Sequence, residues 1–203
     1  MKIRFLGHAS FILEDGVKIA IDPFKIKKKE PVDYIFITHD HYDHCSPDDI
    51  AKLADPDSTI IITPPDSAAR VKQYAKQVFE IEPGQAYETG GIKFRTIPAY
   101  NQDKPFHPRE NNWVGYIIYL AQSIYHCGDT DLIPEMKGLK PDIFLVPVGG
   151  TYTMDSEQAV TAVKIVAPQK VIPMHYGSIV GSTEDAKKLK NQVSIPVEIL
   201  EAE

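Results

Sequence analysis

Short apolar runs separated by polar turns recur along the chain. The run at 34–37 consists of β-branched and aromatic residues and has the length of a buried strand. The same pattern predicts further strands at 3–6, 58–63, 78–81, 86–89, 92–97, 113–120 and 143–148, with two more that start at Ser123 and Lys170. The sequence therefore predicts a β-rich chain.

Four stretches carry helix signals instead. Ser46 precedes a proline and two acids, which is typical of a helix start. Apolar residues recur at spacings of three and four over 66–77, and helices are also predicted over 155–167, where an aspartate is the cap, and over 183–191. Strands followed by helices thus occur twice. This order predicts an α/β (α+β) fold with two β-rich halves and outer helices.

Composition favours a compact enzyme. A chain of 203 residues, 43% hydrophobic, can bury one large core, so we predict a single domain over 1–203. The net charge of −6 lacks the basic footprint that a general nucleic-acid surface needs. No apolar stretch approaches the roughly 20 residues that span a bilayer, and the chain starts on a strand rather than a signal peptide. We predict a cytoplasmic protein without a membrane span, in which Cys45 and Cys127 are free thiols.

The most informative chemistry lies directly after the strand at 34–37. Residues 38–44 read Thr-His-Asp-His-Tyr-Asp-His. Such a cluster is hard to explain as packing, because every buried imidazole or carboxylate needs a partner. A divalent metal supplies one. Nitrogen and oxygen donors without clustered cysteines suit catalytic zinc, with manganese or iron as alternatives.

The run His39-Asp40-His41-Tyr42-Asp43-His44 resembles the HxHxDH signature of the metallo-β-lactamase superfamily. This resemblance implies a four-layer αββα sandwich of the metallo-β-lactamase type with two divalent metal ions. The Gly-Asp-Thr element at 128–130 and the strand that exits at a histidine match further family motifs. The ligands implied by the resemblance are His39 and His41 for the first metal, Asp43 and His44 for the second, Asp129 as the bridge and His175 as the last ligand. The opening stretch resembles a subgroup that includes ascorbate-phosphate lactonases.

One position departs from the family pattern. Most members carry a third histidine for the first metal where this chain has Asn101, and an amide oxygen is a poorer zinc ligand than imidazole. We hypothesise that His107 takes this role; the alternative is a loop histidine that lines the mouth of the site. His8 and Asp22 are candidates for supporting a ligand, and His8 also for contacting substrate. Tyr176 joins Asn101, His107 and His8 as a candidate hydrogen-bond donor to a developing oxyanion.

The remaining histidine and the charged loops allow less specific readings. His126, in the strand before Gly128, is predicted to be a hydrogen-bonded core residue. The lysines at 25 and 27–29 form either a solvated loop or a patch that steers an anionic substrate. Lys104 and Arg109 are further candidates for a phosphate contact.

The predicted function is a metal-dependent hydrolase of a small, anionic substrate. Two cations can lower the pKa of a bound water to about 7, so no nucleophilic side chain is needed. Asp43 is the candidate acceptor of the water proton. Lactone or other ester-type bonds are favoured, with a phosphodiesterase on a nucleotide or phospholipid-derived substrate as the alternative. A non-catalytic metal- or ligand-binding protein remains a third reading because of Asn101. The sequence leaves the oligomeric state open.

Overall fold

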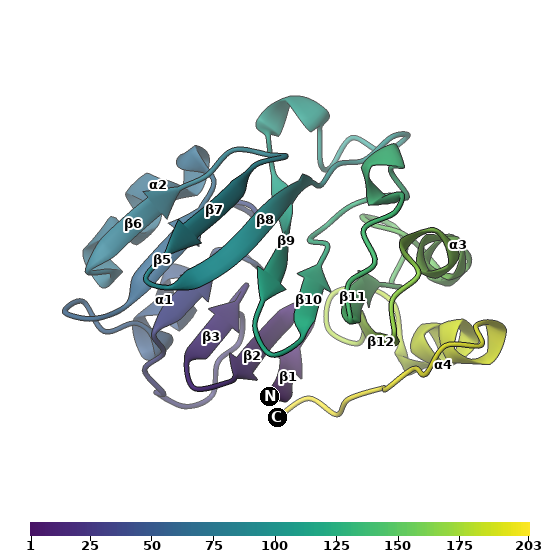
Figure 1. Ribbon diagram of the computed structural model, residues 1–203, viewed down its shortest axis with the longest axis horizontal. Helices are drawn as coiled ribbons and strands as arrows, with labels where there is room; N and C mark the ends of the chain where they lie inside the picture. Colours follow the sequence, from purple (N-terminus) through teal and green to yellow (C-terminus); the bar gives the residue numbers. More distant parts are fainter. The chain divides into compact units, whose positions relative to one another are not determined.

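The computed structural model describes residues 1–203, which divide into two compact units. Unit 1 comprises residues 1–82 and 201–203, and unit 2 comprises residues 83–200. Each unit contains one six-stranded sheet with its own helices (Figure 1). No helix in the chain combines the length and the apolar character that crossing a membrane requires.

The sheet of unit 1 runs in sequence order from β1 to β6. Its strands are β1 (Lys2–Gly7), β2 (Ser10–Glu14), β3 (Lys18–Ile21), β4 (Tyr34–Phe36), β5 (Ile60–Thr63) and β6 (Gln77–Glu80). The first three strands pair antiparallel through short turns, whereas β3 to β6 pair in parallel. Parallel neighbours need a crossover, and helices supply it between β4 and β5 and between β5 and β6.

These crossover helices are α1 (Pro47–Leu53) and α2 (Pro65–Val71), the latter followed by the short 3₁₀ turn η1 (Lys72–Tyr74). α1 starts at the predicted proline and buries Ile50 and Leu53 in the core of unit 1. The prediction of one helix over 66–77 is wrong at its end. From Lys72 to Gln77 no side chain is fully buried, and the chain becomes extended at Ala75 to pair with β5. Sheet pairing therefore overrides the helical spacing there.

The sheet of unit 2 has the strand order β12-β11-β10-β9-β8-β7. Its strands are β7 (Ala86–Thr89), β8 (Ile92–Pro98), β9 (Val114–Tyr119), β10 (Ser123–His126), β11 (Ile143–Pro147) and β12 (Lys170–Met174). β7 to β10 form an antiparallel meander, and β10 to β12 are parallel. Parallel strands are buried on both faces, which accounts for the uninterrupted apolar sequence of β11.

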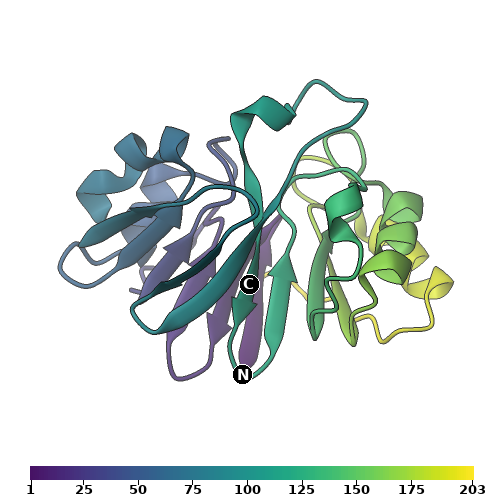
Figure 2. The same cartoon turned by 45° about the horizontal axis from the view of Figure 1, so that its top comes forward.

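The helices of unit 2 are α3 (Ser156–Val166) and α4 (Thr183–Gln192), with 3₁₀ turns η2 (Arg109–Asn111) and η3 (Pro134–Met136). α3 begins with the predicted cap, because Asp155 and Gln158 form a reciprocal capping box. α3 packs against β11 and α4 against β12, and the two helices also contact each other (Figure 2).

Strand direction places the candidate site residues of each unit at one sheet edge. In unit 1, β1, β3 and β4 run the same way, and His8, Asp22 and Thr38 follow at or just beyond their carboxyl ends. In unit 2, β10 and β12 run the same way and are followed by Asp129 and His175. Three of these residues have positive φ, with values of 57° for His8, 46° for Asp22 and 58° for His175. Such strained conformations concentrate at functional sites.

Candidate metal-binding clusters

Histidines and acids gather in two groups, one in each unit. The first cluster, in unit 1, consists of His8, Asp22, His39, His41, Asp43 and His44. The second cluster, in unit 2, consists of Asn101, His107, Asp129 and His175. Apart from His41 all of these side chains are buried. Burial of so many polar groups requires that each be satisfied by a defined partner.

His39 and His41 of the first cluster turn ring nitrogens toward each other. Nε2 of His39 lies 3.1 Å from Nδ1 of His41. Two imidazole nitrogens that bind one tetrahedral zinc ion at about 2.0–2.1 Å are separated by about 3.3 Å. The observed distance is close to this value, so the pair fits a shared metal ion without rearrangement of the loop.

Asp22 connects several residues of the first cluster through hydrogen bonds. Its Oδ1 accepts a hydrogen bond from the backbone amide of Thr38 at 2.8 Å, and its Oδ2 accepts one from the Thr38 hydroxyl at 2.7 Å. The same Oδ2 lies 2.7 Å from Nδ1 of His44. The Thr38 oxygen is in turn 2.9 Å from Nδ1 of His39. Asp22 thus fixes the rings of two histidines, one directly and one through Thr38.

His8 and Asp43 form a further contact within the first cluster. Nε2 of His8 lies 2.9 Å from Oδ2 of Asp43, and Nε2 of His44 lies 3.7 Å from the same oxygen. Each of the three residues offers a ligand atom within 4.8 Å of the others. His8, a candidate from the sequence for supporting a ligand, is placed here to orient the carboxylate of Asp43.

Asp129 is the centre of the second cluster. Its Oδ2 lies 2.9 Å from Nε2 of His175 and 3.3 Å from Nε2 of His107. The parallel strands β10 to β12 bring His175 to Asp129, whereas His107 reaches Asp129 from the loop between the antiparallel strands β8 and β9. His107 therefore faces the carboxylate that the family resemblance identifies as the metal bridge.

Asn101 holds His107 in place. Its amide oxygen is 3.0 Å from the backbone nitrogen of His107 and 3.1 Å from Nδ1 of the ring, and both nitrogens donate to it. Its amide nitrogen donates to the carbonyl of Tyr152 at 2.9 Å. The edge of Trp113 supports the imidazole from one side, with ring centroids 5.6 Å apart. With Nδ1 engaged as a donor, Nε2 of His107 keeps its lone pair toward Asp129.

Other candidates from the sequence have structural partners. His126 is completely buried and its Nδ1 accepts the backbone N–H of Gly128 at 3.2 Å, so the predicted core role is confirmed. Lys104 is paired with Asp131, and Arg109 with Glu135.

Burial shifts the pKa values of Tyr176 and of both cysteines, which were also singled out from the sequence. Burial raises the pKa of the Tyr176 hydroxyl, which therefore stays a proton donor at neutral pH. Both cysteines are free thiols, as predicted, and burial raises the pKa of Cys45 to about 11 and shifts that of Cys127 upward.

Two residues that act on the first cluster were missed from the sequence. Thr38 connects Asp22 to His39, and its position between a buried strand and a histidine was the available signal. Arg70 of α2 donates to the backbone carbonyls of Asp40 and Cys45 and so holds both ends of the histidine loop. No local pattern identifies Arg70, because its partners lie 25 to 30 positions away.

Comparison with known proteins identifies the family. The model of the Beta-lactamase superfamily domain matches residues 2–175. The chain belongs to the metallo-β-lactamase superfamily. A UPF0173 metal-dependent hydrolase of Thermoplasma acidophilum is 33% identical over 202 residues, covering 94% of this chain and 89% of the relative. A UPF0173 metal-dependent hydrolase of Archaeoglobus fulgidus is 31% identical over 222 residues, covering 98% and 95% of the two chains.

A solved structure gives the same result at the level of the fold. The metallo hydrolase Igni18 of the archaeon Ignicoccus hospitalis superposes with a TM-score of 0.79 at 28% identity, covering 98% of this chain and 94% of that one. Both the superfamily and the fold class predicted from the sequence are therefore confirmed. The donor set of the two clusters, imidazole and carboxylate without thiolate, also fits the divalent metals that this superfamily implies.

Proposed function

We propose that this protein hydrolyses an ester-type bond, with lactones as the first candidates, in a small and anionic substrate. Its class, a metal-dependent hydrolase of the metallo-β-lactamase superfamily, follows from the family match and from relatives that carry this name. The observation that carries the proposal is the convergence of His107 and His175 on one carboxylate, Asp129, in a chain that also holds the HxHxDH signature.

The proposed metals are two divalent ions, with zinc first and manganese or iron as alternatives. The proposed ligands are His39, His41 and His107 for one ion, and Asp43, His44 and His175 for the other, with Asp129 shared by both. Asn101 is proposed as a positioning residue for His107 rather than a ligand, because its amide oxygen already accepts two hydrogen bonds from that residue. This assignment removes the main reason for a non-catalytic reading.

Divalent metals bound by these residues would lower the pKa of a water to about 7 and would polarise the substrate oxygen. The side chains supply proton transfer and orientation. Asp43 is the proposed acceptor of the water proton, a role that competes with its proposed role as a ligand, and His8 holds one of its oxygens at 2.9 Å. Tyr176 is a candidate hydrogen-bond donor to the oxyanion, since burial keeps its hydroxyl protonated.

Metal content and substrate class are tested together. Protein purified without chelator is analysed for metals, then assayed under metal titration on lactones, thioesters and bis-aryl phosphates. The proposal expects two metal ions per chain and the highest kcat/KM on a lactone or another carboxylic ester. Turnover of bis-aryl phosphates alone would favour the phosphodiesterase alternative. Bound metal without turnover of any compound would favour a non-catalytic metal- or ligand-binding protein.

The role of His107 has its own test. Replacing His107 with Ala is expected to lower metal occupancy from two ions toward one, since one proposed site loses an imidazole. Phe106→Ala is the matched control, because this exposed neighbour changes the same loop without touching Asp129. Equal metal content and affinity in the two variants would show that His107 is not a ligand. A single domain, cytoplasmic location and small-molecule partner stay predictions from the sequence.

A further inference from the structure

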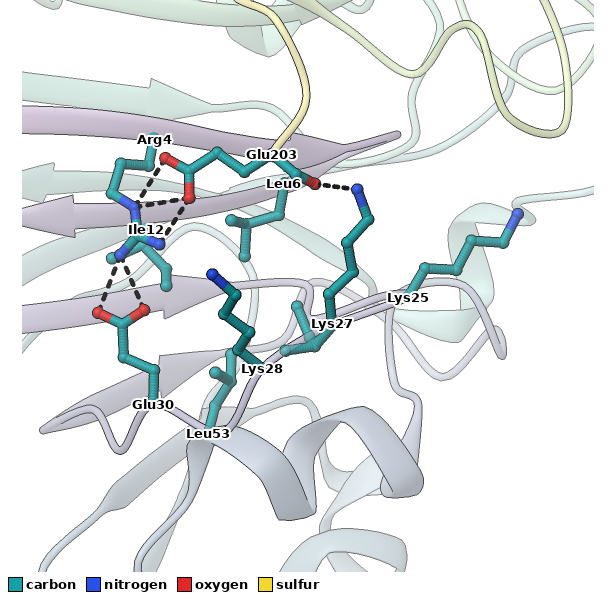
Figure 3. A pocket seen from close by; sticks show the side chains of 10 residues that line it. Arg4, Leu6, Ile12, Lys25, Lys27, Lys28, Glu30, Leu53 and Glu203 are labelled. Atoms are coloured by element: carbon teal, nitrogen blue, oxygen red, sulfur yellow. Dashed lines mark hydrogen bonds and ion pairs between the residues drawn. The ribbon is translucent and has the colours of Figure 1, made fainter.

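Unit 1 contains a cavity of about 130 Å³ (Figure 3). The cavity is lined by residues of β1, β2 and α1, of the loop 25–30, called the lysine loop below, and of the segment 201–203. They are Arg4, Leu6, Ile12, Lys25, Ile26, Lys27, Lys28, Glu30, Leu53 and Glu203. No histidine and no acid of the first cluster belongs to this lining. The cavity is therefore distinct from the proposed metal ligands of its unit.

The floor of the cavity is apolar. Leu6, Ile12, Ile26 and Leu53 come from three different elements and a loop, and together they form a continuous hydrophobic surface. Ile12 and Leu53 are each only 1% exposed, so they belong to the core of unit 1 and give the floor a fixed shape. A ligand that only carried charge would leave this surface in contact with water. An apolar body of the ligand gains about 25 cal/mol for each Å² that it covers.

The rim of the cavity is basic, in contrast to the chain as a whole. Four cationic and two acidic side chains line it, in a protein of net charge −6. Lys28 takes part in none of the hydrogen bonds or ion pairs of unit 1, and its ammonium group points into the space beside Arg4 (Figure 3). Three of the four lysines noted in the sequence thus gather around one cavity.

A carboxylate of the chain itself already occupies the cationic end. Glu203 accepts two parallel hydrogen bonds from Arg4, at 3.0 Å from Nε and 2.7 Å from Nη2. Lys27 donates to the backbone oxygen of the same residue at 2.6 Å. The hydrogen bond from Arg4 holds the pKa of the Glu203 carboxyl below its usual range. This bidentate arrangement is the geometry in which arginine binds carboxylates most strongly.

Arg4 keeps this orientation because two further acids hold its other edge. Glu14 accepts a hydrogen bond from Nη1 of Arg4 at 3.2 Å. Glu30 accepts from Nη1 of Arg4 at 2.9 Å through both oxygens and also binds Lys18. The Arg4 side chain is only 16% exposed, and its remaining pair of donors, Nε and Nη2, is the one that Glu203 occupies. Glu203 is half-exposed and belongs to a short segment held to β1 by one backbone hydrogen bond, from Glu203 N to Phe5 O at 3.1 Å. Such a segment can leave more easily than Glu30.

We propose that this cavity binds a small amphipathic carboxylate, whose carboxylate group replaces that of Glu203 on Arg4 while its apolar body lies over Leu6, Ile12 and Leu53. The bound anion also gains Lys28 as a partner. In the absence of ligand, the Glu203 carboxylate of the chain itself occupies Nε and Nη2 of Arg4, so it competes with the ligand for these two donors. This site lies beyond the proposed hydrolase function, and its test does not depend on metal or turnover.

Isothermal titration with octanoate tests the site directly. Glu203→Gln is expected to bind octanoate about tenfold more tightly than the unchanged protein, because the variant lacks the competing charge. Acetate, which has the charge without the body, and inorganic phosphate, which has no apolar part, are expected to bind at least tenfold more weakly than octanoate. Tighter binding of phosphate than of octanoate would overturn the proposal in favour of an inorganic-anion site, and absence of octanoate binding to the variant would also overturn it.

A pair of lysine variants separates the cavity from general charge attraction. Lys28→Ser is expected to weaken octanoate binding several-fold, whereas Lys29→Ser is expected to leave it unchanged, since Lys29 is exposed in the same loop but does not line the cavity. Both exposed substitutions leave the core intact, and thermal unfolding verifies this. Equal effects of the two variants would mean that octanoate responds to net charge, and the site would be rejected.

Discussion

Oδ2 of Asp22 lies 2.7 Å from Nδ1 of His44, and both side chains are completely buried. An ionised carboxylate only accepts hydrogen bonds, so Nδ1 of His44 carries the proton and Nε2 keeps its lone pair. The same oxygen accepts from Thr38, which leaves the threonine oxygen to accept from Nδ1 of His39. One aspartate therefore orients two imidazoles so that Nε2 of each is the nitrogen left for the proposed metal.

Asp22→Asn tests this arrangement. The amide offers one acceptor in place of two and brings a donor toward groups that already donate, so both histidines lose their fixed tautomer. We expect metal affinity to fall about 10–100-fold, the usual effect of removing a partner of a metal ligand. Competition with a chromophoric chelator measures it. Asp33→Asn is the matched control, because Asp33 accepts from a backbone amide on the exposed side of the same unit. If both variants bind metal as the unchanged protein does, Asp22 has no role in preparing the ligands.

Asn101 and His107 give a second prediction, with a conservative variant that distinguishes support from ligation. Asn101→Ala removes the acceptor for the backbone and for Nδ1 of His107, and we expect metal affinity to fall about tenfold or more. Asn101→Asp keeps an acceptor in the same place and is expected to retain most of the affinity. Chelator competition on the two variants provides the comparison. An equal loss in both would contradict the positioning role.

Position 149 has room only for glycine, because the backbone of His175 lies against it. A Cβ atom at position 149 would lie 2.2 Å from the backbone oxygen of His175, far inside van der Waals contact. Gly149→Ala must therefore displace the backbone at the exit of β12, where His175 has positive φ. We expect a loss of about 1–3 kcal/mol in the free energy of unfolding, together with weaker metal binding.

Urea unfolding and chelator competition measure the two effects of Gly149→Ala. Gly150→Asn serves as the control, since asparagine tolerates the φ of 65° at that position and a Cβ there has only ordinary contacts. A Gly149→Ala protein as stable as the control would show that the exit of β12 has room to adjust.

The sequence predicted those parts of the site that depend on short spacing. The proposed ligands His39, His41, Asp43 and His44 lie within six positions of one another, and Asp129 and His175 closely follow recognisable strands. The function of Asn101 was not predictable, because its two hydrogen bonds to His107 depend on a loop conformation that has no sequence signature. The missing histidine and His107 as its candidate replacement were visible in the sequence, whereas the hydrogen bonds by which Asn101 holds His107 were not.

Contacts between residues far apart in the chain account for the other differences between the predictions and the structure. Lys27 meets Glu203 across 176 positions, so a pattern of lysines alone could not distinguish a solvated loop from the rim of a cavity. The helix expected over 66–77 ended early for a related reason, since the pairing of β6 with β5 is not local. The strands of the parallel regions were predicted because the burial of each strand is recorded in its own residues.

The last prediction concerns stability against pH and rests on Asp49 in α1. Burial by itself would raise the pKa of this carboxyl, but hydrogen bonds from Lys52, Ser46 and the backbone amides of Lys25 and Ile26 hold it below its ordinary value of 3.8. The amide bonds measure 2.8 and 2.9 Å and attach the lysine loop to the helix. A lowered pKa in the folded protein means that the ionised form stabilises the fold. This contribution is present above about pH 4 and is lost as pH falls through the folded pKa.

Asp49→Asn is expected to cost about 2–3 kcal/mol in the free energy of unfolding at pH 7, because hydrogen bonds to a charged acceptor are replaced by weaker ones and the amide places a donor against Lys52. The cost should shrink progressively below about pH 4, where the unchanged protein itself loses the carboxylate. Urea unfolding between pH 7 and pH 2.5 measures both quantities. Asp48→Asn, an exposed neighbour in the same helical turn, is expected to change stability by less than about 0.5 kcal/mol. A pH-independent cost for Asp49→Asn would show that its packing, rather than its charge, holds the loop.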